Sequence, residues 1–340
     1  MNKRVFLQTS LGLGATGMLG RAFGAERRAP RRFASDLALE GLVWRDRSMV
    51  ALGTVLSLRV AHRDGEQADA ALDAAVATLR HIESQMSLFQ PDSALRRLNR
   101  HGRLRQPDAD LLQVLQLAQQ VSARSQGSFD VTVQPLWEAF ESAGREGQLP
   151  SAQAVSEARA KVDWRQLQLD AQQISLGVPG MAVTLNGIAQ GYAADRVRAT
   201  LREHGIEHAL INTGEWAALG RPNAQRGWVL GIANPRDESA MLTRLALGGR
   251  CIATSADNQT TFSADRRHHH IFDPHTGYSP TGLAAVTVAA SSCALADALT
   301  KVMFVAGFEG ALQLAPQWAV DVLVVDKAGR WQATPGLVQV

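Results

Sequence analysis

One histidine of this chain stands where proton transfer would be expected. His270 directly precedes the apolar pair Ile271 and Phe272, and a run of turn residues begins at Asp273. Such a turn would hold the imidazole at the edge of a loop, and there a neutral imidazole can accept a proton from an attacking hydroxyl group. Asp273 could orient the imidazole or merely cap the turn, and the sequence leaves both roles open.

A second candidate is Asp297, the single acidic residue in the apolar run from Cys293 to Phe304. A carboxylate in an apolar helix is costly unless it is paired, capped or bound to a cation. Asp297 could satisfy the first turn of a helix. Alternatively, it could be a hard oxygen ligand for Mg²⁺, which pyrophosphate chemistry would need.

A glycine loop lies between these features and the N-terminal half. Gly187 and Gly191 follow an expected strand at residues 182–185 and open an expected helix. Backbone N–H groups and the positive end of the helix dipole at such a junction can bind phosphate or pyrophosphate. A tight turn that needs glycine for its dihedral angles is the structural alternative.

Three consecutive histidines, His268, His269 and His270, suggest zinc and a secreted metallohydrolase. Neighbouring residues of an extended chain point to opposite faces, so at most His268 and His270 could share a metal. No cysteine or Glu-x-x-His pattern accompanies them, which makes a zinc site a weak hypothesis.

Four aromatic residues are candidates to stack on a planar ring, although the core is the more common place for any one of them. They are Phe89, Phe129, Trp137 and Tyr192.

The elements that must position these residues alternate without a regular strand–helix–strand rhythm. The sequence predicts a strand over residues 50–60 and helices over 68–86, from Asp108 onward, over 190–204 and over 294–304. Short strands are expected at residues 209–212, 228–233, 242–247, 285–290 and 320–325. This mixture predicts an α+β fold with mixed, largely antiparallel sheets flanked by helices.

The N-terminus has the pattern of a cleavable export signal. Lys3 and Arg4 precede a mildly apolar, glycine-rich run that ends in small residues near Ala25. We therefore expect a signal peptide over residues 1–25, a linker over 26–40 and one domain over 41–340. The basic start resembles a twin-arginine signal with Lys3 in place of the first arginine, so the expected location is the periplasm.

The composition limits the remaining function classes. The chain has 340 residues, of which 35 are Lys or Arg and 32 are Asp or Glu. Three of the basic residues lie in the expected signal, so the remainder is neutral and gives no reason to expect nucleic acid. The apolar run of the signal is too short to span a membrane. After export, Cys251 and Cys293 could pair or remain separate buried thiols.

In this order, these motifs resemble the family of FAD:protein FMN transferases, also called the ApbE family, from about Leu52 to Gly307. The matching stretches are Gly53-Thr54, Leu98-Asn99, Phe129-Asp130-Val131-Thr132, Gly191-Tyr192-Ala193-Ala194-Asp195, Gly214-Glu215, His270-Ile271-Phe272-Asp273-Pro274 and Asp297-Ala298-Leu299. The resemblance implies two closely packed lobes with FAD in the cleft between them. It also implies cleavage of the FAD pyrophosphate, release of AMP and a phosphoester between FMN and a Thr or Ser of a client protein.

The resemblance also implies roles for individual residues. His270 would activate the client hydroxyl, and Asp297 with the carbonyl of Gly187 would hold Mg²⁺. Phe89 takes the position of a flavin-stacking residue. The implied cofactor-binding positions are Leu52, Phe89, Ser128, Phe129, Asp130, Thr184, Gly187, Gln190 and Lys301.

Three departures from the family pattern affect the phosphate site. Thr184 and Gln190 replace an acidic residue and a lysine of the glycine loop, and Lys301 stands where a metal-binding threonine is usual. One hypothesis is that the Lys301 ammonium reaches the pyrophosphate or the metal position and reduces the need for Mg²⁺. The alternative for this residue is that Lys301 points into solvent and that catalysis is weaker. The three departures also leave open a different function, that of a non-catalytic periplasmic flavin carrier or an assembly factor for a respiratory complex.

The glycine loop and the export signal together resemble the branch of the family linked to nitrous oxide reductase maturation. This resemblance implies a client with an FMN-binding domain, namely a membrane-bound respiratory flavoprotein.

Overall fold

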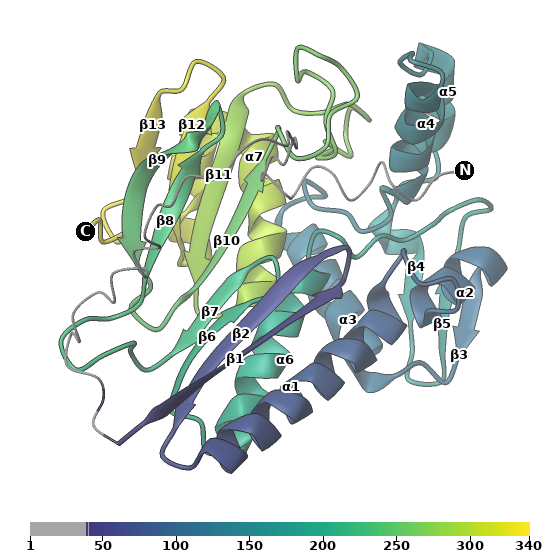
Figure 1. Ribbon diagram of the computed structural model, residues 1–340. Helices are drawn as coiled ribbons and strands as arrows, with labels where there is room; N and C mark the ends of the chain where they lie inside the picture. Colours follow the sequence, from purple (N-terminus) through teal and green to yellow (C-terminus); the bar gives the residue numbers. More distant parts are fainter. Residues whose placement is uncertain (1–38, 40) are drawn as a thin grey trace, which may run out of the picture.

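The computed structural model describes residue 39 and residues 41–340 (Figure 1). The expected signal peptide over 1–25 and nearly all of the expected linker over 26–40 lie outside the described residues. Among the described helices, none is both long enough and apolar enough to cross a membrane.

The centre of the molecule is an antiparallel sheet of eight strands in the order β1-β2-β6-β7-β10-β11-β12-β13. Its strands are β1 (Val43–Ala51), β2 (Thr54–His62), β6 (His208–Asn212), β7 (Trp216–Leu219), β10 (Cys251–Ala256), β11 (Leu283–Ala290), β12 (Asp321–Asp326) and β13 (Trp331–Ala333). The predicted α+β fold with largely antiparallel sheets is therefore confirmed.

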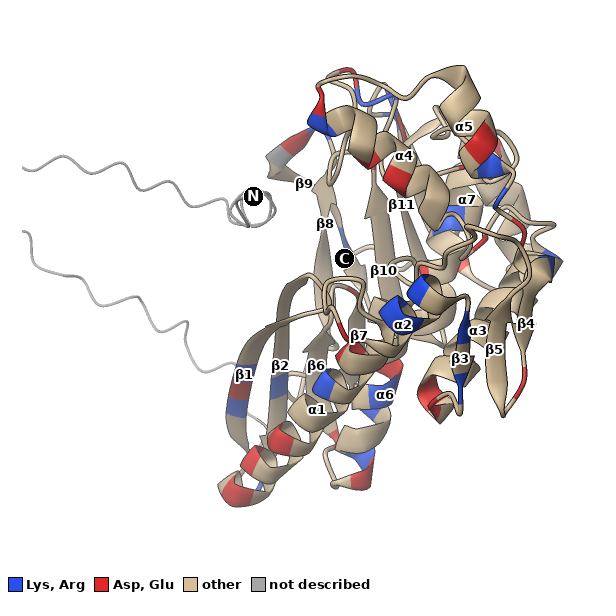
Figure 2. Ribbon diagram, turned by 90° about the vertical axis from the view of Figure 1, so that its right-hand side faces the viewer, with Lys and Arg blue, Asp and Glu red and all other residues tan. Residues whose placement is uncertain are grey.

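Three long helices cover one face of this sheet, α1 (Gly65–Met86), α6 (Ala189–Glu203) and α7 (Cys293–Leu314) (Figure 1). The predicted apolar stripe of α1 is buried at Leu72, Leu79 and Ile82. Helix α3 (Ala109–Arg124) begins after Asp108, whose side chain accepts a hydrogen bond from Asp110 N and caps the helix as predicted. The charged residues of α1 are mainly acidic, as Figure 2 shows, and its single Lys or Arg is Arg80.

A hairpin of β8 (Val229–Asn234) and β9 (Asp237–Ala246) packs on the other face of the sheet. Strand β11 therefore has both faces covered, and all eight of its residues are buried. This burial explains why β11 is a continuous apolar run and shows no alternation of apolar and polar residues.

The remaining elements form a smaller part beside α3. They are α2 (Ala94–His101), α4 (Gln134–Arg145), α5 (Ala152–Arg159) and the short sheet of β3 (Arg103–Arg105), β5 (Gln173–Leu176) and β4 (Leu167–Leu169), with single 3₁₀ turns at Trp164–Gln166 and, elsewhere, Pro316–Trp318. The segment from residue 257 to 282 folds over α4 and α5, because Phe272 packs with Leu136, Phe140 and Val155.

One predicted strand is interrupted by a turn, and another is absent. Residues 50–60 are the end of β1 and most of β2, joined by a turn at Leu52 and Gly53 with φ values of 51° and 80°. A non-glycine residue with positive φ is uncommon, which is why the sequence did not mark this turn. Residues 182–185 form no strand but an extended segment that Asn99 holds through two hydrogen bonds of 2.8 Å to the backbone of Val183.

Candidate active site

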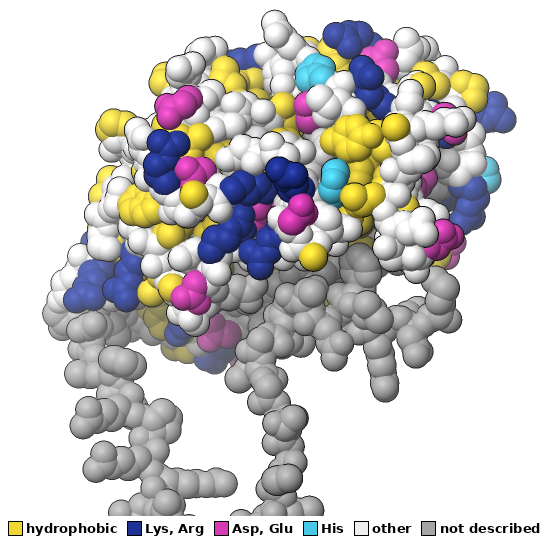
Figure 3. Space-filling view, turned by 90° about the horizontal axis from the view of Figure 1, so that it is seen from above, with side chains coloured by type: hydrophobic (Ala, Val, Ile, Leu, Met, Phe, Trp, Pro, Cys, Tyr) yellow, Lys and Arg dark blue, Asp and Glu magenta, His cyan; other side chains and the backbone are white. Residues whose placement is uncertain are grey.

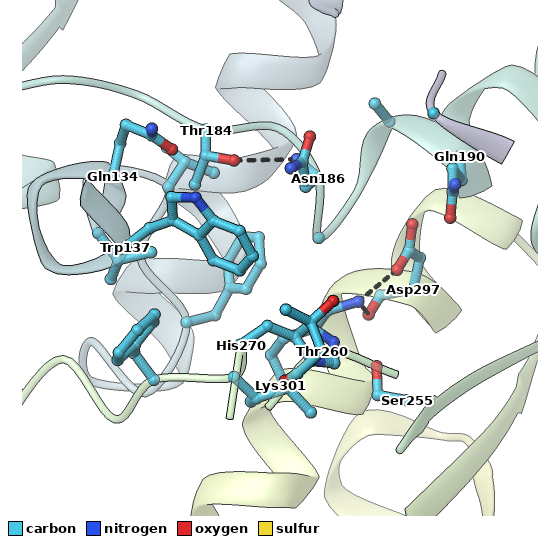
Figure 4. A pocket seen from close by; sticks show the side chains of 18 of the residues that line it. Gln134, Trp137, Thr184, Asn186, Gln190, Ser255, Thr260, His270, Asp297 and Lys301 are labelled. Atoms are coloured by element: carbon cyan, nitrogen blue, oxygen red, sulfur yellow. Dashed lines mark hydrogen bonds and ion pairs between the residues drawn. The ribbon is translucent and has the colours of Figure 1, made fainter. Parts of the chain in front are cut away.

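A cavity of about 280 Å³ lies between the large sheet with α7 and the smaller part that carries α4. All eleven residues predicted for the site line this cavity: Leu52, Phe89, Ser128, Phe129, Asp130, Thr184, Gly187, Gln190, His270, Asp297 and Lys301. Figure 4 labels five of them, Thr184, Gln190, His270, Asp297 and Lys301. These residues come from six separate stretches of the sequence, so the fold brings the predicted set together in one place.

The turn between β1 and β2 forms one wall with Phe89. The backbone N–H of Leu52 donates to Glu83 Oε1 at 2.9 Å, which holds the turn against α1. The ring of Phe89 lies so close to Gly53 that a Cβ atom there would be 2.6 Å from a ring carbon. Phe89 is 52 % exposed, so an aromatic ring is available at the rim of the cavity.

Phe129 and Trp137 also line the cavity, as expected of ring-stacking residues. Tyr192 does not line the cavity; it is 4 % exposed and belongs to the core, the alternative that the sequence favoured for it. Its hydroxyl lies 2.6 Å from Asp110 Oδ1 and 2.8 Å from Gln113 Oε1, so it is directed at α3.

Asp130 is buried and organises the segment that carries Ser128 and Phe129. Its Oδ1 accepts hydrogen bonds from the backbone N–H and the hydroxyl of Thr132, and Oδ2 accepts one from Trp164 N at 3.0 Å. Burial raises the pKa of Asp130, and the hydrogen bonds from Thr132 oppose this rise. The carboxylate therefore lines the cavity while its oxygen atoms hold the local fold.

The glycine loop approaches α7 closely. A Cβ atom at Gly187 would lie 3.1 Å from Lys301 Cε, and one at Gly191 would lie 2.8 Å from Asp297 Cβ. Gly191 N donates to Asp297 Oδ2 at 3.1 Å. The loop therefore supports both interpretations, the tight structural turn and the phosphate site. Glycine is needed for close packing, and α6 begins at the cavity with the positive end of its dipole directed there.

Gln190 extends from the first turn of α6 toward the β1–β2 turn. Its Nε2 atom lies 3.5 Å from the carbonyl oxygen of Leu52, and its backbone carbonyl accepts a hydrogen bond of 2.8 Å from the Thr213 hydroxyl. The neutral side-chain amide thus links the first turn of α6 to the β1–β2 turn.

Two carboxylates and one ammonium group meet at the floor of the cavity. Lys301 Nζ lies 2.5 Å from Asp297 Oδ1 and 3.2 Å from the Asp297 carbonyl oxygen, one helical turn away (Figure 4). Glu215 is 6 % exposed, and its Oε2 accepts a hydrogen bond from Thr254 N. Burial and the charge of Asp297 raise the pKa of Glu215, while Lys301 opposes the rise.

The sequence analysis missed Glu215 as a site residue. The signal was present, because Gly214-Glu215 belongs to the ordered set of matching stretches. Only the pairing of β7 with β6 and β10 shows that this carboxylate faces Asp297 and not solvent.

His270 is half-buried at the edge of the cavity. Its Nδ1 atom lies 3.4 Å from the carbonyl oxygen of Thr260, and a carbonyl oxygen can only accept a hydrogen bond. This contact assigns the proton to Nδ1 and leaves Nε2 as the atom that can accept one. Asp273 caps the turn, since its Oδ1 accepts a hydrogen bond from His275 N at 2.9 Å.

The two histidines before His270 pack against aromatic residues. The ring of His269 is fully buried against Phe304, and its Nε2 lies 3.1 Å from the Pro280 carbonyl oxygen. His268 stacks near Phe140. Among the described residues, the candidate metal clusters are Asp195 with Cys251 and Cys293, and His81 with Asp108 and Asp110, so the histidine run does not form one.

The lowered pKa values of His269 and His270 should make the stability depend on pH. Burial lowers the pKa of His269 and of His270 from 6.5 to about 4. Between these values the unfolded chain binds more protons than the folded chain, so stability falls as the pH decreases. We expect buried His269 alone to lower the free energy of unfolding by about 2 kcal/mol between pH 7 and pH 5, measured by urea denaturation.

The matched control is His269→Gln, which cannot take up a proton. It should flatten the dependence of the unfolding free energy on pH, whatever its stability at pH 7. The comparison separates His269 from Glu215, whose raised pKa acts in the opposite direction. An unchanged slope in His269→Gln would contradict the assignment.

The segment that carries Thr260 and His270 is anchored by a buried carboxylate. Asp257 is fully buried and binds Arg236 through two hydrogen bonds of 2.7 Å and Lys327 through one of 2.6 Å. Burial alone would raise the pKa of Asp257, but these cations lower it below its usual value. Arg236 and Lys327 are thus paired with Asp257, which lies three residues before Thr260.

Basic side chains also line a shallow pocket outside the cavity, together with Asp265: Arg236, Arg266, Arg267 and Lys327. In the face shown from above, basic side chains gather at the centre with acidic ones beside them (Figure 3). The basic residues on this face are therefore mixed with acidic ones.

Cys251 and Cys293 are both buried free thiols. They lie beside Asp195, which accepts hydrogen bonds from the Ser292 hydroxyl and from Ala294 N and so ties α6 to the start of α7.

Comparison with known proteins agrees with this geometry. The model of a family described as the ApbE family matches residues 52–324. A protein of Vibrio cholerae named FAD:protein FMN transferase is 30% identical over 259 residues, which are 73% of this chain and 77% of that protein. A protein of the same name from Klebsiella pneumoniae is 28% identical over 289 residues, which are 82% and 88% of the two chains.

Solved structures give the same relationship. The ApbE protein from Thermotoga maritima superposes with a TM-score of 0.78 at 26% identity and covers 86% of this chain and 97% of its own. The apo form of the Pseudomonas stutzeri flavinyl transferase ApbE has a TM-score of 0.76 at 28% identity and covers 88% and 96%.

Proposed function

Since the chain belongs to the ApbE family, we propose that it transfers FMN from FAD to a Thr or Ser hydroxyl of a client protein and releases AMP. The observation that carries this proposal is the convergence of all eleven predicted residues on one cavity, with His270 and the Asp297–Lys301 pair on the same side. Aromatic rings at the rim suit the flavin, and the polar floor suits a pyrophosphate.

In the proposed reaction, the client hydroxyl oxygen bonds to the phosphorus of the FMN half of FAD. The bond from this phosphorus to the bridging oxygen breaks, and its electron pair leaves with AMP. His270 takes the hydroxyl proton at Nε2. Phosphoryl transfer needs mainly positioning and charge stabilisation, so few residues suffice.

The chain's residues have definite tasks in this reaction. Phe89, Phe129 and Trp137 would contact the flavin. The start of α6 and the glycine loop would hold the pyrophosphate, because the helix dipole favours negative charge there.

Mg²⁺ was expected on Asp297 and the Gly187 carbonyl, but the arrangement does not fit a divalent ion well. Asp297 Oδ1 already has the Lys301 ammonium at 2.5 Å, and Oδ2 accepts a hydrogen bond from Gly191 N. No step above depends on a metal.

The client and the location are further parts of the proposal. We propose that the protein acts in the periplasm after export by the twin-arginine-like signal, and that the client is a membrane-bound respiratory flavoprotein. The pattern of residues 1–25 and the glycine loop support these two points.

The test is to incubate the mature protein with FAD and an FMN-binding domain that carries an acceptor Thr. We expect the client's intact mass to increase by that of an FMN group, with one AMP released for each client modified. A client in which the acceptor Thr is Val should gain nothing. Tight FAD binding without transfer to any acceptor would favour the flavin carrier instead.

A further inference from the structure

The charge balance of the cavity floor is unusual for a site that binds pyrophosphate. Asp297 is 1 % exposed, and its negative charge would repel a dianion. Among the described residues that line the cavity, Lys301 is the single Lys or Arg. Any positive side chain offered to the pyrophosphate from this lining must therefore be Lys301.

The path of the Lys301 side chain places its ammonium between two elements. The aliphatic part crosses Gly187, where a Cβ atom would be 3.1 Å from Cε. The ammonium ends on Asp297, with Oδ1 at 2.5 Å and the carbonyl oxygen at 3.2 Å. The Lys301 side chain thus packs against the glycine loop and directs its ammonium at Asp297, and Figure 4 shows this second contact.

A divalent cation bound to Asp297 and the glycine loop would have to occupy the position of the Lys301 ammonium. A dication there would be repelled by the ammonium twice as strongly as a second ammonium would be. An ammonium has three donors, and two are directed at Asp297, so one remains for a phosphate oxygen.

We propose that Lys301 is the resident cation of this site and takes the place of Mg²⁺, so that flavin transfer by this chain does not require a divalent metal. The inference rests on the proposed function. In the transfer step, the hydroxyl oxygen bonds to the FMN phosphorus, the proton goes to His270 and the phosphorus–oxygen bond to AMP breaks. Lys301 keeps its proton and neutralises the charge on the AMP oxygen that leaves.

The first experiment measures transfer by the wild type and by Lys301→Thr, with EDTA or with Mg²⁺. The wild-type rate should differ by less than twofold between the two conditions. The transfer rate of Lys301→Thr should fall at least tenfold in EDTA and recover with Mg²⁺. Loss of the ammonium frees Asp297 to bind a metal, and the Thr hydroxyl offers a further oxygen ligand. Lys301→Arg, which keeps the charge, should retain more activity in EDTA than Lys301→Thr.

Two controls test whether the charge at this position matters. Lys301→Ala should lose more activity than Gln190→Ala, because the amide carries no charge. Lys161→Ala removes an ammonium outside the cavity and should leave the rate unchanged. Equal activity of Lys301→Ala and the wild type would overturn the proposal.

A binding measurement distinguishes this proposal from the proposed function. Mn²⁺ binding, followed by electron paramagnetic resonance without FAD, should be at least tenfold tighter in Lys301→Thr than in the wild type. Adding Asp297→Asn to Lys301→Thr should abolish the gain. If Lys301→Thr does not fold, Lys301→Met keeps the aliphatic chain and removes only the charge.

Failure of the Lys301 proposal and failure of the proposed function give different results. Wild-type Mn²⁺ binding as tight as that of Lys301→Thr, together with inactivation by EDTA, would overturn the role of Lys301. Absence of transfer under every condition would overturn the proposed function, and the Mn²⁺ measurement would still decide the role of Lys301.

Discussion

Replacing His270 by glutamine is expected to slow flavin transfer by about 10²–10⁴-fold while FAD binding stays within a few-fold of the wild type. Glutamine can keep a hydrogen bond to the Thr260 carbonyl oxygen, as Nδ1 of the imidazole does at 3.4 Å. It has no basic nitrogen, so it cannot take the proton of the client hydroxyl. The measurement is the initial rate of AMP release beside FAD affinity from flavin fluorescence.

The matched control is His275→Gln, in the same loop but exposed and outside the cavity. It should transfer FMN at the wild-type rate. Loss of activity in both variants would point to a disturbed loop, and full activity of His270→Gln would exclude His270 as the base.

The pH dependence gives a second check on the same residue. Because burial lowers the pKa of His270 to about 4, the imidazole is neutral throughout the range from pH 5 to 7. The pH dependence of kcat/KM reports the ionisation of the free enzyme. A histidine base with the usual pKa would be protonated at pH 5 and kcat/KM would fall, whereas we expect kcat/KM of this protein to stay constant between pH 7 and pH 5.

The sequence predicted those elements whose periodicity and caps are local. The stripe of α1 and the Asp108 cap of α3 depend on residues a few positions apart, and both are present in the structure. The turn at Leu52 was missed because its positive φ is imposed by tertiary contacts, including the hydrogen bond to Glu83.

The site was predictable as a set of residues and less so as an arrangement. The ordered motifs placed His270 and Asp297 in one site, and the structure brings both to one cavity. The i, i+4 spacing of Asp297 and Lys301 already allowed an ion pair on one helix face. The position of Glu215 beside that pair depends on strand pairing, which no local pattern shows.

One contact couples the fold directly to the site. Gly191 in the first turn of α6 meets the start of α7, where Cys293 and Asp297 lie, and its N–H holds Asp297 Oδ2 at 3.1 Å. Packing of these two helices therefore sets the position of the carboxylate that binds Lys301. A side chain at residue 191 would disturb stability and the site together.

Gly191→Ala is accordingly expected to lower the free energy of unfolding by about 3 kcal/mol. Its Cβ atom would overlap the Cys293 carbonyl oxygen and lie 2.8 Å from Asp297 Cβ, and neither helix can move without opening the buried core. Urea denaturation measures the loss, and AMP release should fall even under conditions where the variant is folded. Gly227→Ala is the matched control, because a Cβ atom there has no neighbour within 4 Å and its stability should be unchanged. A Gly191→Ala variant as stable and active as the wild type would show that α6 and α7 can separate without cost, and that Asp297 does not depend on their contact.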